Sequence, residues 1–254
     1  PRPLGKLAVS KLAFIPEGLE EPVFSGLSFQ VNPGELLGIT GPVGAGKSTL
    51  VRLLLGVIKP AQGSVRLDGA DVYAWNADDL GRHVGYIPQV VELLPGTIRD
   101  NIARFSAAPS EQVIEAAHRA GIHQLILQFP EGYDTVIGGP ADRLSVGTRQ
   151  RVALARALFG DPSLVILDEP YSNLDMDGVT ALIEAIQGLK ARGATTIIVA
   201  HRPSILAHAE RVLLLQDGCG KIVTKGTHTN LRVFSGADQP AGKAGADDAA
   251  RSVA

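Results

Sequence analysis

The stretch GPVGAGKST at residues 41–49 constrains the fold of this chain more than any other. It matches the pattern G-x-x-x-x-G-K-[ST], which binds phosphate groups when it lies between a strand and a helix. The apolar run 36–40 precedes it, and residues 48–58 have helical character. This context fits the pattern and disfavours the alternative, a glycine-rich turn that matches by chance.

The residue types of this loop explain how it would hold a nucleotide. Glycines let successive backbone N–H groups turn inward around phosphates, and the following helix directs its positive end at them. Lys47 is expected to reach the β- and γ-phosphates of ATP, and the Ser48 hydroxyl is expected to bind Mg²⁺. The residues expected to contact the nucleotide are Gly41, Val43, Gly44, Ala45, Gly46, Lys47, Ser48 and Thr49.

An apolar segment that ends in two carboxylates, LVILDE at residues 164–169, is the candidate second half of the site. A buried strand ending in Asp168 would place this carboxylate at the C-terminal edge of a parallel sheet, beside the phosphate loop. There Asp168 can bind Mg²⁺ directly or through water, and Glu169 can act as general base on an attacking water. Taken alone, the Asp-Glu pair is explained equally well as a helix N-cap.

Three further polar residues lie where strands or turns are expected to end. Gln89 follows residues 84–88 and is a candidate ligand of Mg²⁺ or of the attacking water. His201 follows the apolar run 197–200, where it could donate a hydrogen bond to the γ-phosphate. Asp175 ends the turn-like segment SNLD. Individually these are a loop residue, a structural histidine and a helix cap, but together with the two motifs they favour ATP hydrolysis.

Apolar segments that alternate with helical ones predict an α/β protein with a mostly parallel sheet. Short alternating segments between residues 4 and 31 predict antiparallel strands ahead of the phosphate loop. Residues 92–150 have helical patterns and lie between strand-like regions, which indicates an inserted α-helical subdomain. The other expected elements are strands at 63–67, 84–87, 164–167 and 195–200, and helices at 110–120, 122–128, 149–159 and 179–192.

The fold class is therefore α/β, a P-loop NTPase core with an N-terminal antiparallel β subdomain and an inserted α-helical subdomain. We assign residues 1–234 to one domain, and the Ala-, Gly- and Asp-rich residues 235–254 to a disordered tail. The absence of an initiator methionine favours a fragment of a longer polypeptide.

Charge and cysteine content exclude several classes of protein. The net charge of −2 offers no basic surface for a nucleic acid, so we expect no such partner. The single cysteine, Cys219, cannot form an internal disulfide. No run approaches the roughly 20 apolar residues of a membrane span, and the N-terminus lacks the core of a signal peptide. These features predict a cytosolic domain.

Together, the motifs make residues 5–234 resemble the nucleotide-binding domain of an ATP-binding-cassette (ABC) transporter. In that family the segments correspond to Walker A at 41–49, the Q-loop at Gln89, the signature loop at 144–148, Walker B at 164–169, the D-loop at Asp175 and the H-loop at His201. The stretches LGRHVGYIPQVVELLPGTIRDNIARF and ARALFGDPSLVILDEPYSNLD are similar to type I secretion ATPases, especially the protease and lipase exporter branch.

The resemblance implies partners and a location. Two such domains, in a homodimer or a heterodimer, would enclose ATP between Walker A of one copy and Ser145 and Gly147 of the other. The domain would be fused behind a transmembrane domain at the cytoplasmic face of the inner membrane. The helical subdomain and residues 89–104 would contact that membrane domain, although 89–104 could also be a surface loop. In the secretion branch, a periplasmic adaptor and an outer-membrane channel complete the exporter of unfolded polypeptides.

Four positions depart from the family pattern. Val146 stands where a second glycine is usual, and because a β-branched residue disfavours positive φ, we expect the loop to approach the γ-phosphate less closely. Thr148 replaces a glutamine, and Gly139 replaces an acidic residue of the loop before the signature. Ile15 occupies the position where exporters stack an aromatic ring on adenine, which predicts apolar contact only. We expect slower hydrolysis or weaker dimerisation, not loss of function.

Two other functions remain as alternatives. The altered signature, LSVGT, would suit an ATP-binding regulatory half of a heterodimeric transporter that hydrolyses ATP weakly, although Glu169 and His201 are both present. A soluble cassette ATPase of DNA repair or translation is disfavoured, because the chain has neither a second cassette nor a coiled-coil insert.

Overall fold

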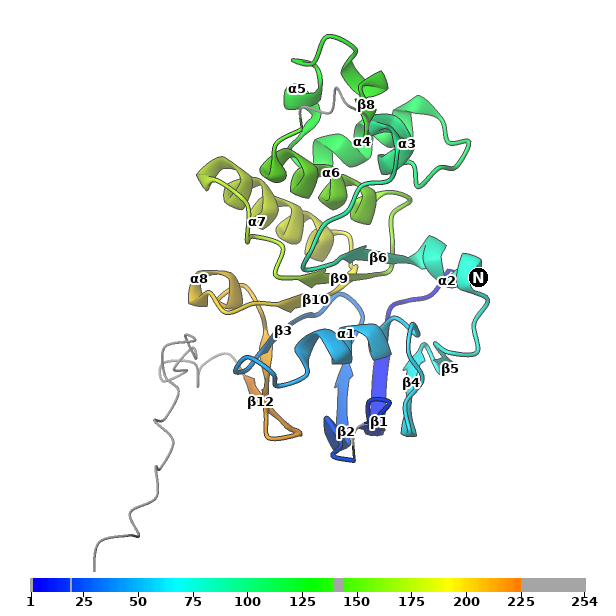
Figure 1. Ribbon diagram of the computed structural model, residues 1–254, viewed down its shortest axis with the longest axis vertical. Helices are drawn as coiled ribbons and strands as arrows, with labels where there is room; N and C mark the ends of the chain where they lie inside the picture. The colour runs from blue at the N-terminus through cyan, green and yellow to red at the C-terminus, as the bar shows by residue number, and fades with distance from the viewer. Residues whose placement is uncertain (1, 19, 139–143, 225–254) are drawn as a thin grey trace, which may run out of the picture.

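The computed structural model describes residues 2–18, 20–138 and 144–224. A six-stranded sheet forms its centre, in the order β12-β11-β3-β10-β9-β6 (Figure 1). Five strands run parallel, and β12 closes one edge antiparallel to β11. The bounds are β3 (Leu36–Thr40), β6 (Val84–Ile87), β9 (Leu164–Asp168), β10 (Thr195–Val199), β11 (Arg211–Gln216) and β12 (Cys219–Thr224).

A second, antiparallel sheet of four strands lies below the central one in Figure 1, in the order β2-β1-β4-β5. Its strands are β1 (Leu7–Phe14), β2 (Phe24–Val31), β4 (Gln62–Leu67) and β5 (Ala70–Asp71). Helix α1 (Lys47–Leu54) packs between the two sheets. The apolar layer there includes Leu7, Phe24 and Leu67 from the small sheet, Ile39 and Ile166 from the central sheet and Leu50 from α1.

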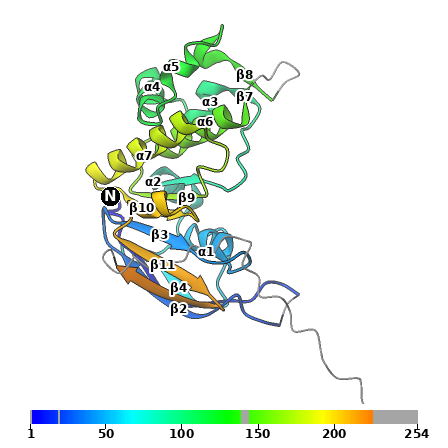
Figure 2. The same ribbon diagram turned by 90° about the vertical axis from the view of Figure 1, so that its left-hand side faces the viewer.

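The opposite face of the central sheet is covered by α6 (Val146–Leu158) and α7 (Met176–Ala191), as Figures 1 and 2 show. Ile87, Val165 and Leu167 of the sheet are fully buried against this layer, together with Val152 of α6 and Leu182 of α7. The strands β3, β9 and β10 are buried at every position, since both faces of the sheet are covered. This explains why they are continuous apolar runs in the sequence.

Small elements form a separate layer beyond α6. They are β7 (Gly96–Thr97), α3 (Ile98–Ile102), α4 (Ser110–Arg119), α5 (His123–Ile126), a 3₁₀ turn at Gly132–Asp134 and β8 (Val136–Ile137). A capping box begins α3, in which Thr97 and Asp100 bond each other's backbone N–H. Helix α2 (Ala77–His83) contacts the edge strand β6, whereas α8 (Pro203–Leu206) follows β10 and packs against β3, where Leu206 lies next to Gly38.

The fold class predicted from the sequence is confirmed, but several bounds differ. The first helix ends at Leu54 and not at residue 58, because the chain turns at Gly56, whose φ is 70°. In place of the helix expected over residues 122–128, only His123–Ile126 form a single helical turn. The strands β11 and β12, the helices α2 and α3 and the β7–β8 pair were not expected. The division into residues 1–234 and a tail stays a prediction, since residues 225–254 lie outside the described residues. Gly139 also lies outside them.

Within the described residues, no helix has the combination of length and apolar character needed to cross a membrane.

Candidate nucleotide-binding site

The loop between β3 and α1 has the backbone geometry of a phosphate cradle. Gly44 and Gly46 adopt φ values of 83° and 84°, a region that favours glycine. A Cβ on Gly46 would lie 2.4 Å from Cγ1 of Val23, and one on Gly41 would lie 2.3 Å from the carbonyl oxygen of Leu215. Close packing around the loop therefore leaves no room for a side chain at Gly41 or Gly46.

Lys47 curls back over this loop. Its ammonium group donates hydrogen bonds to the carbonyl oxygens of Gly41, at 3.0 Å, and Pro42, at 2.9 Å. The side chain is buried, which lowers the pKa of Lys47, while the carboxylates of Glu169 and Asp168 act in the opposite direction. A partly desolvated cation is thus held at the loop, close to two carboxylates.

Asp168 and Ser48 provide oxygen ligands at the edge of the sheet. Asp168 is the last residue of β9, is only 2% exposed and accepts a hydrogen bond from the Ser48 side chain. Burial raises the pKa of Asp168, although the bond from Ser48 and the charge of Lys47 oppose this. A hydroxyl and a carboxylate are ligand types that suit Mg²⁺, which commonly completes its shell with water and substrate phosphates. The donor set therefore fits this cation.

The described residues contain no cluster of three or more His, Cys, Asp or Glu side chains that could hold a metal by themselves. A cation at Ser48 and Asp168 would accordingly need oxygens from a bound ligand. This requirement agrees with a phosphate loop next to the pair.

Three predicted residues meet at the carboxyl ends of neighbouring strands. Glu169 follows β9, and its Oε2 accepts a hydrogen bond from Nε2 of Gln89 at 3.2 Å. Nε2 of His201 lies 2.9 Å from the other carboxylate oxygen, Oε1, which requires the Nε2–H form of the ring. The backbone N–H of Glu169 donates to the carbonyl of Val199 at 3.0 Å. Both carboxylate oxygens are thereby oriented by separate donors.

One residue of this site was not predicted. Tyr171 is only 5% exposed, and its hydroxyl accepts a hydrogen bond from the backbone N–H of His201 at 2.7 Å. The guanidinium of Arg202 lies over its ring, 4.8 Å from the centroid. Tyr171 therefore fixes the backbone that carries His201. Nothing in the local sequence distinguishes this tyrosine from an ordinary core aromatic.

The stretch that begins α6 is built around Ser145. Its side chain is the N-cap of the helix and accepts the N–H of Thr148 at 3.1 Å. The hydroxyl of Thr148 lies 2.9 Å from that of Ser145, and Thr148 is 8% exposed. A Cβ on Gly147 would lie 3.0 Å from the carbonyl oxygen of Asn173, so the helix start packs closely on that loop.

The expectation for Val146 was wrong in its backbone argument. Val146 is the first residue of α6 and is not among the residues with positive φ, so its β-branched side chain meets no conformational penalty there. Its side chain is 61% exposed. The helix also begins at Val146 and not at residue 149, because the Ser145 cap starts it earlier.

Asp175 and Ile15 are placed differently from the residues above. Asp175 caps α7: it accepts the N–H of Gly178 at 2.8 Å and a bond from Arg151 at 2.8 Å, which together lower its pKa. The helix-cap interpretation of Asp175 is thus correct within one copy of the chain. Ile15 follows β1 and is 46% exposed, and Val43 in the phosphate loop is 87% exposed.

The residues of the two candidate half-sites lie on opposite faces of the central sheet. The phosphate loop leads into α1 on one face, whereas Ser145 and Gly147 begin α6 on the other (Figures 1 and 2). The structure brings Lys47, Ser48, Asp168, Glu169, Gln89 and His201 together around the carboxyl edge of the sheet.

Comparisons with known proteins agree with this geometry. A family model described as "ABC transporter" matches residues 24–172. The type I secretion system ATP-binding protein PrsD of Rhizobium meliloti (strain 1021) is 51% identical over 219 residues, which are 86% of this chain and 38% of that protein. The human ATP-binding cassette sub-family B member 6 is 42% identical over 207 residues, 81% of this chain and 24% of that protein.

Among solved structures, a bacterial Atm1-family ABC exporter with ATP bound superimposes with a TM-score of 0.78. The sequence identity is 34%, and the match covers 87% of this chain and 38% of the exporter chain. The chain therefore spans well under half the length of the relatives that it matches.

Proposed function

The chain belongs to the ABC transporter family, and on this premise we propose that it is the ATP-hydrolysing domain of a membrane exporter. The observation that carries the proposal is the Gln89–Glu169–His201 arrangement next to Lys47 and Asp168. A phosphate loop alone would support nucleotide binding. A carboxylate oriented by two donors beside that loop supports hydrolysis.

Different residues of the site would bind ATP and Mg²⁺ and activate the attacking water. The backbone N–H groups of the phosphate loop and the Lys47 ammonium would bind the phosphates of ATP, and Ser48 and Asp168 would hold Mg²⁺. Mg²⁺, when bound, supplies positive charge that offsets the charge developing on the phosphate oxygens. Gln89 and His201 keep the Glu169 carboxylate in place, so that it can accept the proton of the attacking water.

A second copy of the domain would complete each site. Ser145 and Gly147 begin α6 on the face of the sheet opposite to α1, so we assign them to the ATP of a partner domain. The N-terminus of α6 has a positive end and a hydroxyl group, both suited to a γ-phosphate. Asp175, next to that helix start, and Val43 on the phosphate loop would also face the partner. Ile15 remains our candidate for apolar contact with adenine.

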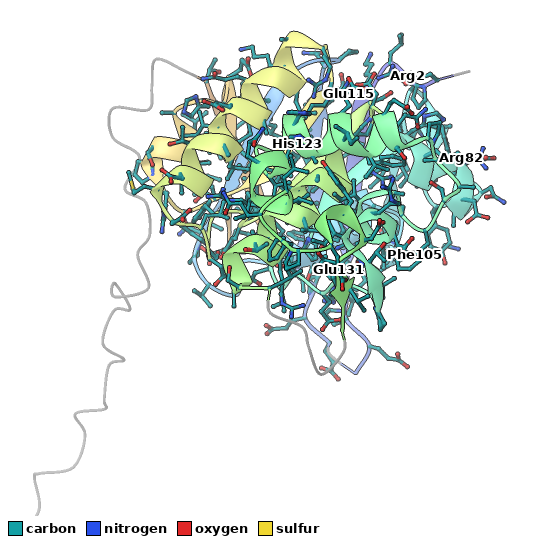
Figure 3. The ribbon with its side chains drawn as sticks, turned by 90° about the horizontal axis from the view of Figure 1, so that it is seen from above. Arg2, Arg82, Phe105, Glu115, His123 and Glu131 are labelled. Atoms are coloured by element: carbon teal, nitrogen blue, oxygen red, sulfur yellow. The ribbon has the colours of Figure 1, made fainter. Side chains whose placement is uncertain are left out.

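A groove away from the phosphate loop supports a membrane partner. It has a volume of about 840 Å³ and lies between α2, the end of β6 and the start of the helical layer. Figure 3 shows Arg82, which lines the groove, and the neighbouring Phe105 on the side away from α7. We assign this groove, with residues 89–104, to contact with the transmembrane domain that precedes such domains in exporters.

Arginine side chains line one part of the groove, among them Arg104 and Arg156. Arg104 donates to the carbonyls of Gly81, at 2.6 Å, and Arg156, at 2.9 Å, and burial lowers its pKa to about 10. Arg156 donates to the carbonyl of Glu92. Within the part of the chain that the structure describes, neither guanidinium pairs with a carboxylate. An acidic side chain on the docking segment would complement them.

The cargo is proposed from the relatives. PrsD belongs to a type I secretion system, so we propose that this chain drives secretion of a polypeptide from the cytoplasmic face of the inner membrane. A periplasmic adaptor and an outer-membrane channel would then complete the export path. Neither the name of the sub-family B relative nor that of the Atm1-family exporter mentions secretion, so the proposed cargo rests on the PrsD similarity alone.

The competing function is an ATP-binding half of a heterodimer that hydrolyses weakly. This function is suggested by Val146 and Thr148, which replace the usual glycine and glutamine of the signature loop. Against it, Val146 has an ordinary helical backbone, and the two donors to Glu169 are intact. A Val146→Gly, Thr148→Gln double variant separates the two functions, because a large rise in turnover would favour the weakly hydrolysing half.

Steady-state ATP turnover of the dimer, or of the chain joined to its membrane domain, tests the proposed function. We expect turnover that requires Mg²⁺, stops in EDTA and exceeds that of Glu169→Gln and Lys47→Ala variants. Equal rates for wild type and both variants would refute hydrolysis by this site.

Thr148 offers a finer prediction. If Thr148 donates its hydroxyl proton to Ser145, the Ser145 O–H is left free to donate to a phosphate, and the two bonds reinforce each other. Thr148→Val keeps the backbone N–H that donates to the Ser145 cap but removes this hydroxyl donor. We expect the ATP concentration for half-maximal turnover to rise about three- to tenfold, the value of one hydrogen bond.

Thr148→Ser is the matched control, since it restores the hydroxyl and should restore the wild-type value. If the serine variant behaves like the valine variant, the methyl packing of Thr148 and not its hydroxyl is important.

A further inference from the structure

Gln150 is a buried polar residue of α6 that the proposed mechanism does not use. It is only 2% exposed, and its Nε2 donates to the carbonyl oxygen of Pro170 at 3.0 Å. Its Oε1 is buried without a hydrogen-bond partner. A buried amide costs free energy unless its groups are bonded, and an apolar side chain of similar size would avoid that cost. The bond to Pro170 is therefore the feature that Gln150 provides.

Pro170 is the residue next to Glu169. Glu169 has a φ of 48°, which is uncommon for a residue other than glycine and persists only where neighbouring contacts hold it. The carbonyl of Glu169 accepts bonds from the N–H and the hydroxyl of Ser172, at 3.2 Å and 3.0 Å. Gln150 donates to the carbonyl of Pro170, the next residue along the chain. The proposed general base thus sits on a backbone that α6 helps to hold.

Two further contacts tie the start of α6 to the same segment. Gly147 packs so closely that an added Cβ would lie 3.0 Å from the carbonyl of Asn173. Arg151 forms an ion pair with Asp175 at 2.8 Å. Residues 147, 150 and 151 share one face of the helix, because they are spaced by three and four positions. The first two turns of α6 and residues 170–175 therefore form one connected unit.

This unit joins two sites that belong to different ATP molecules. The first turn of α6, with Ser145, is the half-site that we assign to the partner's ATP, whereas Glu169 serves the chain's own ATP. We propose that Gln150 is a positioning residue that couples these two sites, by holding Glu169 in register with the start of α6. The inference rests on the proposed function, since it needs ATP at both sites of a dimer.

The coupling has a direct consequence for kinetics. When the partner's ATP fixes the start of α6, Pro170 and with it Glu169 are fixed as well. Hydrolysis at one site should then depend on occupancy of the other, so turnover rises cooperatively with ATP concentration. Without the Gln150 bond, the two sites should act more independently and the base should be less well placed.

Gln150→Met tests this, because methionine has a similar length and no donor for Pro170. We expect maximal turnover to fall about tenfold, the value of one buried hydrogen bond. The ATP concentration for half-maximal turnover should stay within about twofold of wild type, and the Hill coefficient should fall towards one. The measurement is ATP turnover against ATP concentration for the complete dimeric protein. Gln187→Met is the matched control, since Gln187 is exposed on α7.

Gln150→Leu provides a second variant in case methionine impairs folding. Leucine has no donor for the Pro170 carbonyl, so the same loss of cooperativity is expected. A wild-type Hill coefficient in a folded variant of either kind would overturn the proposal, whatever happens to thermal stability. Failure of the proposed function is distinguishable, because the wild-type protein would then show no turnover in the same assay.

Discussion

Replacing Glu169 with glutamine is expected to lower ATP turnover by about 10²- to 10⁴-fold, the range for loss of a general base, while ATP binding is retained. The amide cannot accept the proton of the attacking water. Its single oxygen can accept from Nε2 of Gln89 or from Nε2 of His201 but not from both, so one of the two donor contacts of Glu169 is lost or His201 must change tautomer. The variant therefore removes the proton acceptor and alters the contacts that orient the side chain.

We expect the Glu169→Gln variant to stop after ATP binding and before hydrolysis. Because Lys47, Ser48 and Asp168 are unchanged, the Glu169→Gln protein should bind ATP and accumulate as an ATP-bound dimer on size-exclusion chromatography, while phosphate release nearly stops. Glu184→Gln is a suitable control, since Glu184 is exposed on α7. Turnover above about a tenth of the wild-type rate would be too high for loss of a general base, and another group would have to be assigned this role.

That Gln89, Glu169 and His201 lie close together could be predicted from the sequence, because the order of the strands determines it. Gln89, Glu169 and His201 each follow a strand of one parallel sheet, and β6, β9 and β10 lie side by side in it. The carboxyl ends of neighbouring parallel strands meet at one edge, so residues that are about 80 and 30 positions apart come together. Identifying the three strands was sufficient to place the three side chains.

The details that the sequence did not reveal depend on tertiary contacts. The conformation of Val146 follows from the Ser145 cap, which is a local contact with Thr148, and from the packing of Gly147 on Asn173, which the local sequence does not reveal. The roles of Tyr171 and Gln150 depend on single hydrogen bonds to distant backbone groups. The short elements were missed for a related reason, because a strand of two residues, such as β7, has no measurable periodicity.

Lys47→Ala is expected to act at an earlier step than Glu169→Gln. The Lys47 ammonium is hydrogen-bonded to the phosphate loop itself, and hydrogen bonds that involve charged groups contribute about 1.5–3 kcal/mol each. We therefore expect the dissociation constant for ATP to rise about 10- to 100-fold, and turnover and ATP-driven dimerisation to fall below detection. Binding measured by fluorescent-nucleotide titration separates the two variants, since Glu169→Gln should retain it.

The same substitution should leave the nucleotide-free fold nearly as stable as before. Burial lowers the pKa of Lys47, which means that the folded protein disfavours the charged form relative to the unfolded chain. Removing the charge relieves this cost and offsets the lost bonds to the carbonyls of Gly41 and Pro42. The melting temperature without ATP should change by less than about 4 °C, which corresponds to roughly 1 kcal/mol for a domain of this size.

Lys221→Ala is the control for this experiment, because Lys221 is exposed on β12 and should affect neither ATP binding nor stability. If Lys47→Ala melted much earlier than wild type without ATP, the bonds from Lys47 to the loop carbonyls would be structural. In that case weak ATP binding would reflect a collapsed loop. An unchanged melting temperature combined with lost ATP binding would instead mean that Lys47 serves phosphate binding and not the stability of the fold. The burial that lowers its pKa would then be a free-energy cost that the folded chain bears for the sake of that binding.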